Sequence, residues 1–271
     1  MTAYVLVPGF WLGAWAWEDV TERLRAAGHE VHPVTLTGQA DRAAEATPDV
    51  GVETHIADVI AVLESHDLRE VVLVAHSGGT TPVTGAADRI PERIARIVYV
   101  DTGPLPDGMA QIEFNPPEVQ AAIEKRVADE GDGWKIPVPA FDPAEDPENL
   151  AGLTEGHLRA MRERGTPQPF GTASEPLRRP EVIPGTPRTL ISCTFTLEQV
   201  KGLAASGNPV FASMAGPEWT YHALPTGHWP MFSRPADLAA LLSGDGGDAG
   251  QAIGAPHEQV VPSAGTFPSS R

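Results

Sequence analysis

The sequence predicts an α/β protein with a doubly wound, mostly parallel sheet and a small helical cap inserted after the strand that ends at Asp101. Short apolar runs alternate with amphipathic helical segments through the first hundred residues, which is typical of a parallel sheet with crossover helices. This alternation stops near residue 104, where prolines become frequent, and resumes near residue 188. A length of 271 residues with 41% hydrophobic residues suffices for one core and an inserted subdomain. We therefore expect a core of residues 1–103 and 187–242, a cap of residues 104–186, and a disordered tail of residues 243–271.

In the first half of the chain, continuous apolar segments rich in β-branched residues predict buried strands. Apolar residues recurring at helical spacing predict the helices between them, and Gly28 is a typical helix stop. The polar segment 38–52 has no clear period and is expected to be a surface loop. The expected strands are 4–7, 30–36, 71–74 and 94–100, and the expected helices are 17–27, 56–63 and a segment that includes 86–90.

The proline-rich segment 104–186 contains two helical pieces, near 118–130 and 155–164. Its apolar side chains are too numerous to leave in water, so we expect it to cover the carboxyl edge of the sheet and to form a pocket wall. Regular structure then resumes as strands at 188–193 and 219–224 and as helices at 197–206 and 235–242. The last segment, beyond residue 243, consists mainly of small and polar residues without periodicity, which indicates disorder.

The composition excludes several classes of protein. A formal net charge of −17 disfavours binding to nucleic acid and to anionic membrane surfaces, because both are negatively charged. Cys193 is the only cysteine, so neither an internal disulfide nor a cysteine-based zinc cluster can form. The first residues lack the basic region of a signal peptide, and no apolar run reaches membrane-spanning length. We expect a cytoplasmic protein.

The segment around Ser77 predicts a catalytic nucleophile. A buried strand runs directly into Ala75-His76-Ser77-Gly78-Gly79 and then into a helix. A serine at the apex of such a turn, with small residues on both sides, describes a nucleophile elbow. Ala75 stands where the usual Gly-x-Ser-x-Gly pattern has its first glycine. The turn places the serine in a strained backbone conformation that exposes its hydroxyl.

A serine hydroxyl needs a base to take its proton, and that base is usually histidine. His228 lies in a loop directly after the last strand, on the edge where the serine emerges. His29, His32, His55 and His66 are expected near the surface, and the side chain of His76 should point away from Ser77. Hydrolysis also needs donors for the developing oxyanion. We expect these to be the backbone N–H groups of Gly78 and of Phe10, in the glycine-rich loop after the first strand.

These segments together resemble the α/β-hydrolase superfamily, and most closely its branch of small esterases that includes plant methylesterases and hydroxynitrile lyases. The resemblance rests on residues 5–9, 13–17, 26–31, 75–79, 98–101 with Pro106, and 227–231, and it covers about residues 3–242. It implies Ser77 as nucleophile, His228 as base, the amides of Phe10 and Gly78 as oxyanion hole, and neither a cofactor nor a metal. Trp229 and Gly9 stand where the lyases carry a lysine and a hydroxyl residue, which disfavours the lyase reaction. Pro8 replaces the histidine that is usual in the family.

The third member of a catalytic triad stays open at this point. The acid normally follows the strand after the cap, yet residues 192–196 contain no carboxylate, and Glu198 is the nearest one. Asp101, at the end of the strand that follows the elbow, offers an alternative on a neighbouring sheet edge, a placement that resembles some haloalkane dehalogenases. We therefore keep Asp101, Glu198 and the absence of an acid as three possibilities, with Asp101 favoured.

The expected function is hydrolysis of a carboxylic ester or lactone of a small to medium apolar molecule through an acyl-enzyme. Aromatic residues expected to line the substrate pocket are Trp11, Trp134, Phe141 and Trp229. The alternative is a hydrolase-fold ligand-binding protein, or a non-hydrolytic enzyme, with a vestigial triad. An epoxide hydrolase or dehalogenase of this fold would need an aspartate at position 77. The expected partner is a small-molecule ester, and monomer and dimer remain equally open.

Overall fold

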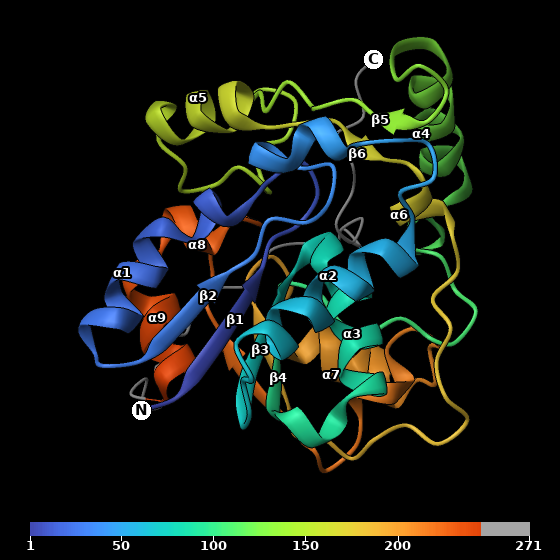
Figure 1. The fold of residues 1–271 in the computed structure, drawn as a ribbon. Coiled ribbons are helices and arrows are strands. Elements are labelled where there is room, and N and C mark those ends of the chain that lie inside the picture. Colours follow the sequence, from blue (N-terminus) through green and yellow to red (C-terminus); the bar gives the residue numbers. More distant parts are fainter. Residues whose placement is uncertain (245–271) are drawn as a thin grey trace.

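The computed structural model describes residues 1–244, and a six-stranded sheet runs through its centre (Figure 1). The strand order is β2-β1-β3-β4-β7-β8, and every neighbouring pair is parallel. This order confirms the predicted doubly wound parallel sheet. The strands are β1 (Ala3–Val7), β2 (Glu30–Pro33), β3 (Val71–His76), β4 (Ile94–Val100), β7 (Arg188–Ser192) and β8 (Trp219–Ala223).

Helices cover both faces of the sheet because successive strand side chains point to opposite faces. Tyr4 and Leu6 of β1 pack with α1 (Glu18–Ala26) and α9 (Pro235–Ser243) on one face. Val5 and Val7 pack with the helices of the other face, which are α2 (Val52–Ser65), α3 (Thr80–Arg89) and α7 (Leu197–Ala205). Burial of the central strands β1 and β3 on both faces explains why their sequences read as continuous apolar runs rather than as alternating patterns.

Between β4 and β7 the chain forms the segment that we call the cap, residues 104–186. It contains α4 (Pro117–Glu130), α5 (Glu155–Arg164), α6 (Gly171–Ser174) and a two-stranded antiparallel sheet of β5 (Lys135–Ile136) and β6 (Gln168–Pro169). Figure 1 shows α4, α5, β5 and β6 above the main sheet. Their buried apolar residues join the core cluster of the α1–α9 face. The boundaries between core and cap stay predictions.

Three local expectations were wrong. The second strand ends at Pro33 rather than at residue 36. The segment 38–52 is not loop throughout, because it contains the 3-10 helix η2 (Ala40–Glu45) and the first residue of α2. His55 is buried rather than at the surface, and its Nε2 lies 2.9 Å from the carbonyl oxygen of Thr37.

The topology places the site. Strands β1 and β3 are neighbours in the sheet. From β1 the chain continues to β2 on one side of this pair, and from β3 it continues to β4 on the other side, so the loops after β1 and β3 diverge. The carboxyl ends of strands at such a switch point form a ligand-binding crevice. The segments that follow β1, β3, β4, β7 and β8 all meet at this edge and carry the residues described below.

The expected disordered tail, residues 243–271, lies outside the described residues apart from its first two positions. Ser243 is the last residue of α9, and Gly244 follows it in the left-handed conformation with a φ of 82°. Among residues 1–244, no helix combines the length and the apolar character needed to cross a membrane.

Candidate active site

Ser77 occupies the turn between β3 and α3. Its φ of 49° lies in the left-handed region, which costs energy for a non-glycine residue and holds the hydroxyl clear of the sheet. The turn is crowded on both sides. A Cβ on Gly78 would lie 2.4 Å from the Phe10 ring, and a Cβ on Gly9 would lie 2.9 Å from the Cβ of Ser77. Ala75 is fully buried within β3, so its extra methyl group is accommodated.

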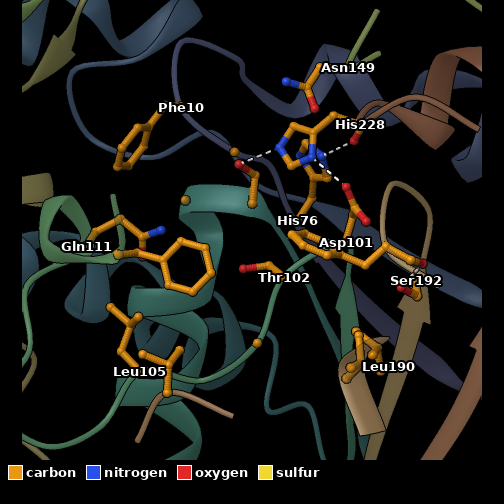
Figure 2. Close-up of a pocket in the computed structure, with 18 of the residues that line it drawn as sticks. Phe10, His76, Asp101, Thr102, Leu105, Gln111, Asn149, Leu190, Ser192 and His228 are labelled. Atoms are coloured by element: carbon orange, nitrogen blue, oxygen red, sulfur yellow. Dashed lines mark hydrogen bonds and ion pairs between the residues drawn. The ribbon is translucent and has the colours of Figure 1, made fainter. Parts of the chain in front are cut away.

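The His228 imidazole lies between Ser77 and Asp101. Figure 2 shows the His228 ring beside the Asp101 carboxylate. Its Nδ1 is 2.7 Å from Oδ2 of Asp101, and its Nε2 is 2.8 Å from Oγ of Ser77. Because the carboxylate accepts the Nδ1 proton, Nε2 is left with a lone pair that accepts from the serine hydroxyl. This is the tautomer that a general base requires.

The structure therefore brings Asp101, and not Glu198, to the histidine. Asp101 lies directly after β4 with a φ of 49°, and its side chain is 1% exposed. Glu198 is an exposed residue in the first turn of α7. The loop after β7, which carries the acid in the usual arrangement, instead supplies donors to Asp101. The N–H groups of Cys193 and Thr194 donate to Oδ1, and the Thr194 hydroxyl donates to Oδ2.

These contacts also determine the charge of Asp101. Burial by itself would raise the pKa of the carboxyl group. The hydrogen bond and the charge interaction with His228, together with the N–H groups of Thr194 and Cys193, outweigh burial and lower the pKa. Asp101 is therefore ionised at neutral pH and can hold the histidine in its required orientation.

The backbone of His228 is held from two further sides. Its N–H donates to the carbonyl of Asn149 in the cap at 2.7 Å, and its carbonyl accepts from Nε2 of His76 at 2.7 Å. The His76 ring also packs 4.8 Å from the His228 ring, so His76 contacts the histidine on the Asp101 side of the site; that its side chain points away from Ser77 stays a prediction. Burial, followed by the charge of His228, lowers the pKa of His76 to about 3. His76 is therefore a neutral donor at physiological pH.

The two amides expected to bind an oxyanion lie on adjacent segments. The loop that carries Gly9 and Phe10 runs against the elbow, and Gly78 is the first residue after the serine. That these N–H groups stabilise an oxyanion stays a prediction.

A cavity of about 90 Å³ opens at Ser77. Trp11 and Trp229 line it, in agreement with the sequence-based expectation, whereas Trp134 and Phe141 do not. Phe141 is buried behind the cavity, between Trp11 and Trp229. Trp134 is only partly buried, and the Lys135 ammonium lies 4.9 Å from its ring centroid. Aromatic residues in the cap could not be assigned to the pocket from composition alone, because this depends on the path of the chain.

Much of the apolar wall comes from residues other than the four aromatic residues expected to line the pocket; one of them, Phe114, belongs to the apolar cap residues from which a pocket wall was expected. Phe114 of the cap faces Phe211 with ring centroids 6.3 Å apart. An apolar group at 210–214, between a predicted helix and a predicted strand, was the signal that could have located this wall. Polar side chains on the lining include Gln111, which points into the cavity in Figure 2. Further lining residues that were missed are Thr102, Gly103, Leu105, Asn115, Asn149, Leu190, Ser192, Phe195, Val200, Val210 and Met214.

Among residues 1–244, no group of three or more histidine, cysteine, aspartate or glutamate side chains is arranged to hold a metal ion. A parallel sheet with a strained serine, a histidine and a buried carboxylate in one hydrogen-bonded line defines the class: a capped α/β protein with a Ser-His-Asp site.

The comparison with known proteins agrees with this class. Residues 4–241 match the model of the alpha/beta hydrolase family, so the chain belongs to this family, as the sequence resemblance predicted. A carbendazim hydrolyzing esterase of Nocardioides sp. is 32% identical over 253 residues, which cover 90% of this chain and 99% of that protein. Methylesterase 9 of Arabidopsis thaliana is 37% identical over 118 residues, which cover 43% of this chain and 44% of the plant protein.

Solved structures agree in fold. An extracellular alpha/beta-hydrolase from a Paenibacillus species superimposes with a TM-score of 0.70 at 20% identity, covering 90% of this chain and 98% of that chain.

Proposed function

We propose that this protein is a serine hydrolase that cleaves a carboxylic ester or lactone of a small to medium apolar molecule. The observation that carries the proposal is the unbroken hydrogen-bonded line from Ser77 through His228 to the buried Asp101. The relatives support the same reaction class, because they are named esterases and methylesterases.

The geometry suggests the following course. Oγ of Ser77 attacks the ester carbonyl carbon while Nε2 of His228 takes the hydroxyl proton. Asp101 stabilises the imidazolium that forms and keeps its orientation. The N–H groups of Phe10 and Gly78 donate to the carbonyl oxygen as it becomes negative. His228 then gives the proton to the leaving alcohol, which leaves an acyl group on Ser77. A water molecule activated by His228 attacks the acyl carbon, and the carboxylic acid departs as Ser77 recovers its proton.

The cavity supports a small apolar group as the part of the substrate that it binds. A volume of about 90 Å³ is well above the ~10–15 Å³ that a cavity needs to hold one water molecule, so the cavity can admit a small group of a substrate. Aromatic and aliphatic side chains make up much of the lining, and polar side chains such as Asn115 and Asn149 also contribute. The Gln111 amide is another of these polar groups. Its hydrogen bond with the Thr81 hydroxyl ties this amide to α3. A short acyl or alcohol group fits this space better than a long chain.

The test is labelling by a fluorophosphonate probe and hydrolysis of p-nitrophenyl esters. We expect the wild type and the exposed-serine control Ser65→Ala to react, and Ser77→Ala to lose both activities. We also expect kcat/KM to be higher for the acetate and butyrate esters than for the decanoate ester. A wild type that never exceeds Ser77→Ala would favour a ligand-binding protein with a vestigial triad.

The cellular location is a separate proposal. The cytoplasmic location expected from the first residues rests on sequence alone, and the Paenibacillus neighbour is named an extracellular protein.

A further inference from the structure

Phe141 belongs to the cap, yet it lies between the two loops that carry the proposed catalytic groups. It is 2% exposed and has a φ of 46°, in the left-handed region that is unfavourable for a phenylalanine. The Arg162 guanidinium holds this conformation by donating to the carbonyls of Ala140 and Phe141, both at 2.8 Å. A conformation that is held in this way at the cost of strain points to a use for the side chain.

The Phe141 ring is the central member of a continuous series of edge-to-face ring contacts. On one side it meets Trp11 with centroids 6.1 Å apart, and Trp11 meets Phe10 at 6.1 Å. On the other side Phe141 meets Trp229 at 5.6 Å, and Trp229 meets His228 at 5.1 Å. The interplanar angles lie between 81° and 84°. This geometry is the preferred one for aromatic pairs, so each contact restrains its neighbours. The series joins the residue of the proposed oxyanion hole to the proposed base.

The cap binds the same two loops through hydrogen bonds. Trp11 has a φ of 65°, its carbonyl accepts from Thr166 N–H at 2.9 Å, and its N–H donates to Oε1 of Gln168 at 3.3 Å. The N–H of His228 donates to the carbonyl of Asn149. Two cap segments, at Asn149 and at residues 166–168, thus form hydrogen bonds with the loops after β8 and β1. The Phe141 ring, from a third cap segment, packs between these two loops.

We propose that Phe141 is a positioning residue that sets the separation of the oxyanion loop from the His228 loop. This inference rests on the proposed ester hydrolysis at Ser77. Phe141 does not line the cavity, so it acts on the arrangement of the reacting groups and not on the binding of the substrate. A misplacement of about 1 Å between catalytic groups can cost about 10²-fold in rate.

The experiment compares Phe141→Leu and Phe141→Ala with Trp134→Leu, a matched control in which a cap aromatic outside the cavity is replaced. For each variant, kcat and KM are measured with p-nitrophenyl butyrate, and titration with a fluorophosphonate gives the concentration of active sites. Affinity for an alkyl boronic acid reports transition-state binding, because its tetrahedral adduct on Ser77 places an oxygen at the oxyanion position.

We expect kcat per titrated site to fall about 10- to 100-fold in Phe141→Ala, with a smaller loss in Phe141→Leu, unchanged KM and a parallel loss of boronic acid affinity. Trp134→Leu should match the wild type. An increase in KM at constant kcat would make Phe141 a pocket residue and would overturn the inference. A normal kcat per titrated site together with a lower concentration of active sites would also overturn the inference, because Phe141 would then only stabilise the fold. An inactive, unlabelled wild type would refute the proposed function itself.

Discussion

Asp101→Asn tests the position of the acid, which is the least usual feature of the site. Oδ1 of Asp101 accepts two backbone N–H groups, from Cys193 and Thr194, and only an oxygen can stand there. The amide nitrogen of asparagine must therefore take the place of Oδ2, which faces Nδ1 of His228. It would donate to Nδ1 and force the proton of the imidazole onto Nε2. That nitrogen could no longer accept the proton of Ser77.

The expected loss follows from this tautomer. The same change in a serine-protease triad lowers kcat by about 10⁴-fold, which corresponds to about 5 kcal/mol of transition-state stabilisation. The buried surroundings of Asp101 leave no space for a second arrangement of the amide, so we expect a loss of about 10³–10⁴-fold.

The assay is the hydrolysis of p-nitrophenyl butyrate, with Ser77→Ala as the blank and Glu198→Gln as the matched control. Glu198→Gln removes the other candidate carboxylate and should leave the rate unchanged, because Glu198 is exposed. Circular dichroism of each variant confirms that it is folded. An Asp101→Asn enzyme close to the wild-type rate, or a Glu198→Gln enzyme with a comparable loss, would refute the assignment of the acid.

Two further predictions concern stability. Folding lowers the pKa of His76 from its ordinary value of 6.5 to about 3, so the unfolded chain binds more protons between these values and stability falls as the pH is lowered through this window. This change in the pKa of His76 corresponds to at most about 5 kcal/mol of unfolding free energy. In His76→Leu, the free energy of unfolding measured in urea should therefore depend less on pH than in the wild type. An unchanged pH dependence would contradict this role of His76. The second concerns the bidentate ion pair of Arg179 with Asp88, whose side chains are 6% and 5% exposed. Arg179→Met leaves the buried charge of Asp88 unpaired and should lower the free energy of unfolding, measured in urea, by about 3–5 kcal/mol. Adding Asp88→Leu should restore part of this loss. If the losses of the two single variants simply add in the double variant, the two residues are not coupled.

Local pattern was sufficient for the fold class and for the turn that carries Ser77, the proposed nucleophile. The apolar run at 71–74 followed by Ser77 and two glycines can satisfy its steric demands only as a strand, a sharp turn and a helix, and it does so. His228 was also predictable, because its place directly after the last strand puts it on the same sheet edge as Ser77. Both inferences depend on neighbours in the chain, and such information is present in the sequence itself.

The sequence by itself determined the parallel sheet, the elbow and the short set of candidates for base and acid. Only the tertiary structure decided which carboxylate reaches His228, because Cys193 and Thr194, whose N–H groups donate to Asp101, lie 92 and 93 residues away from it in the chain. It likewise decided that Phe141 joins two loops instead of lining the cavity, and that His76 supports the backbone of His228. Composition shows that a side chain is apolar or titratable. Which groups it meets depends on how distant segments pack, and that is set only when the whole chain has folded.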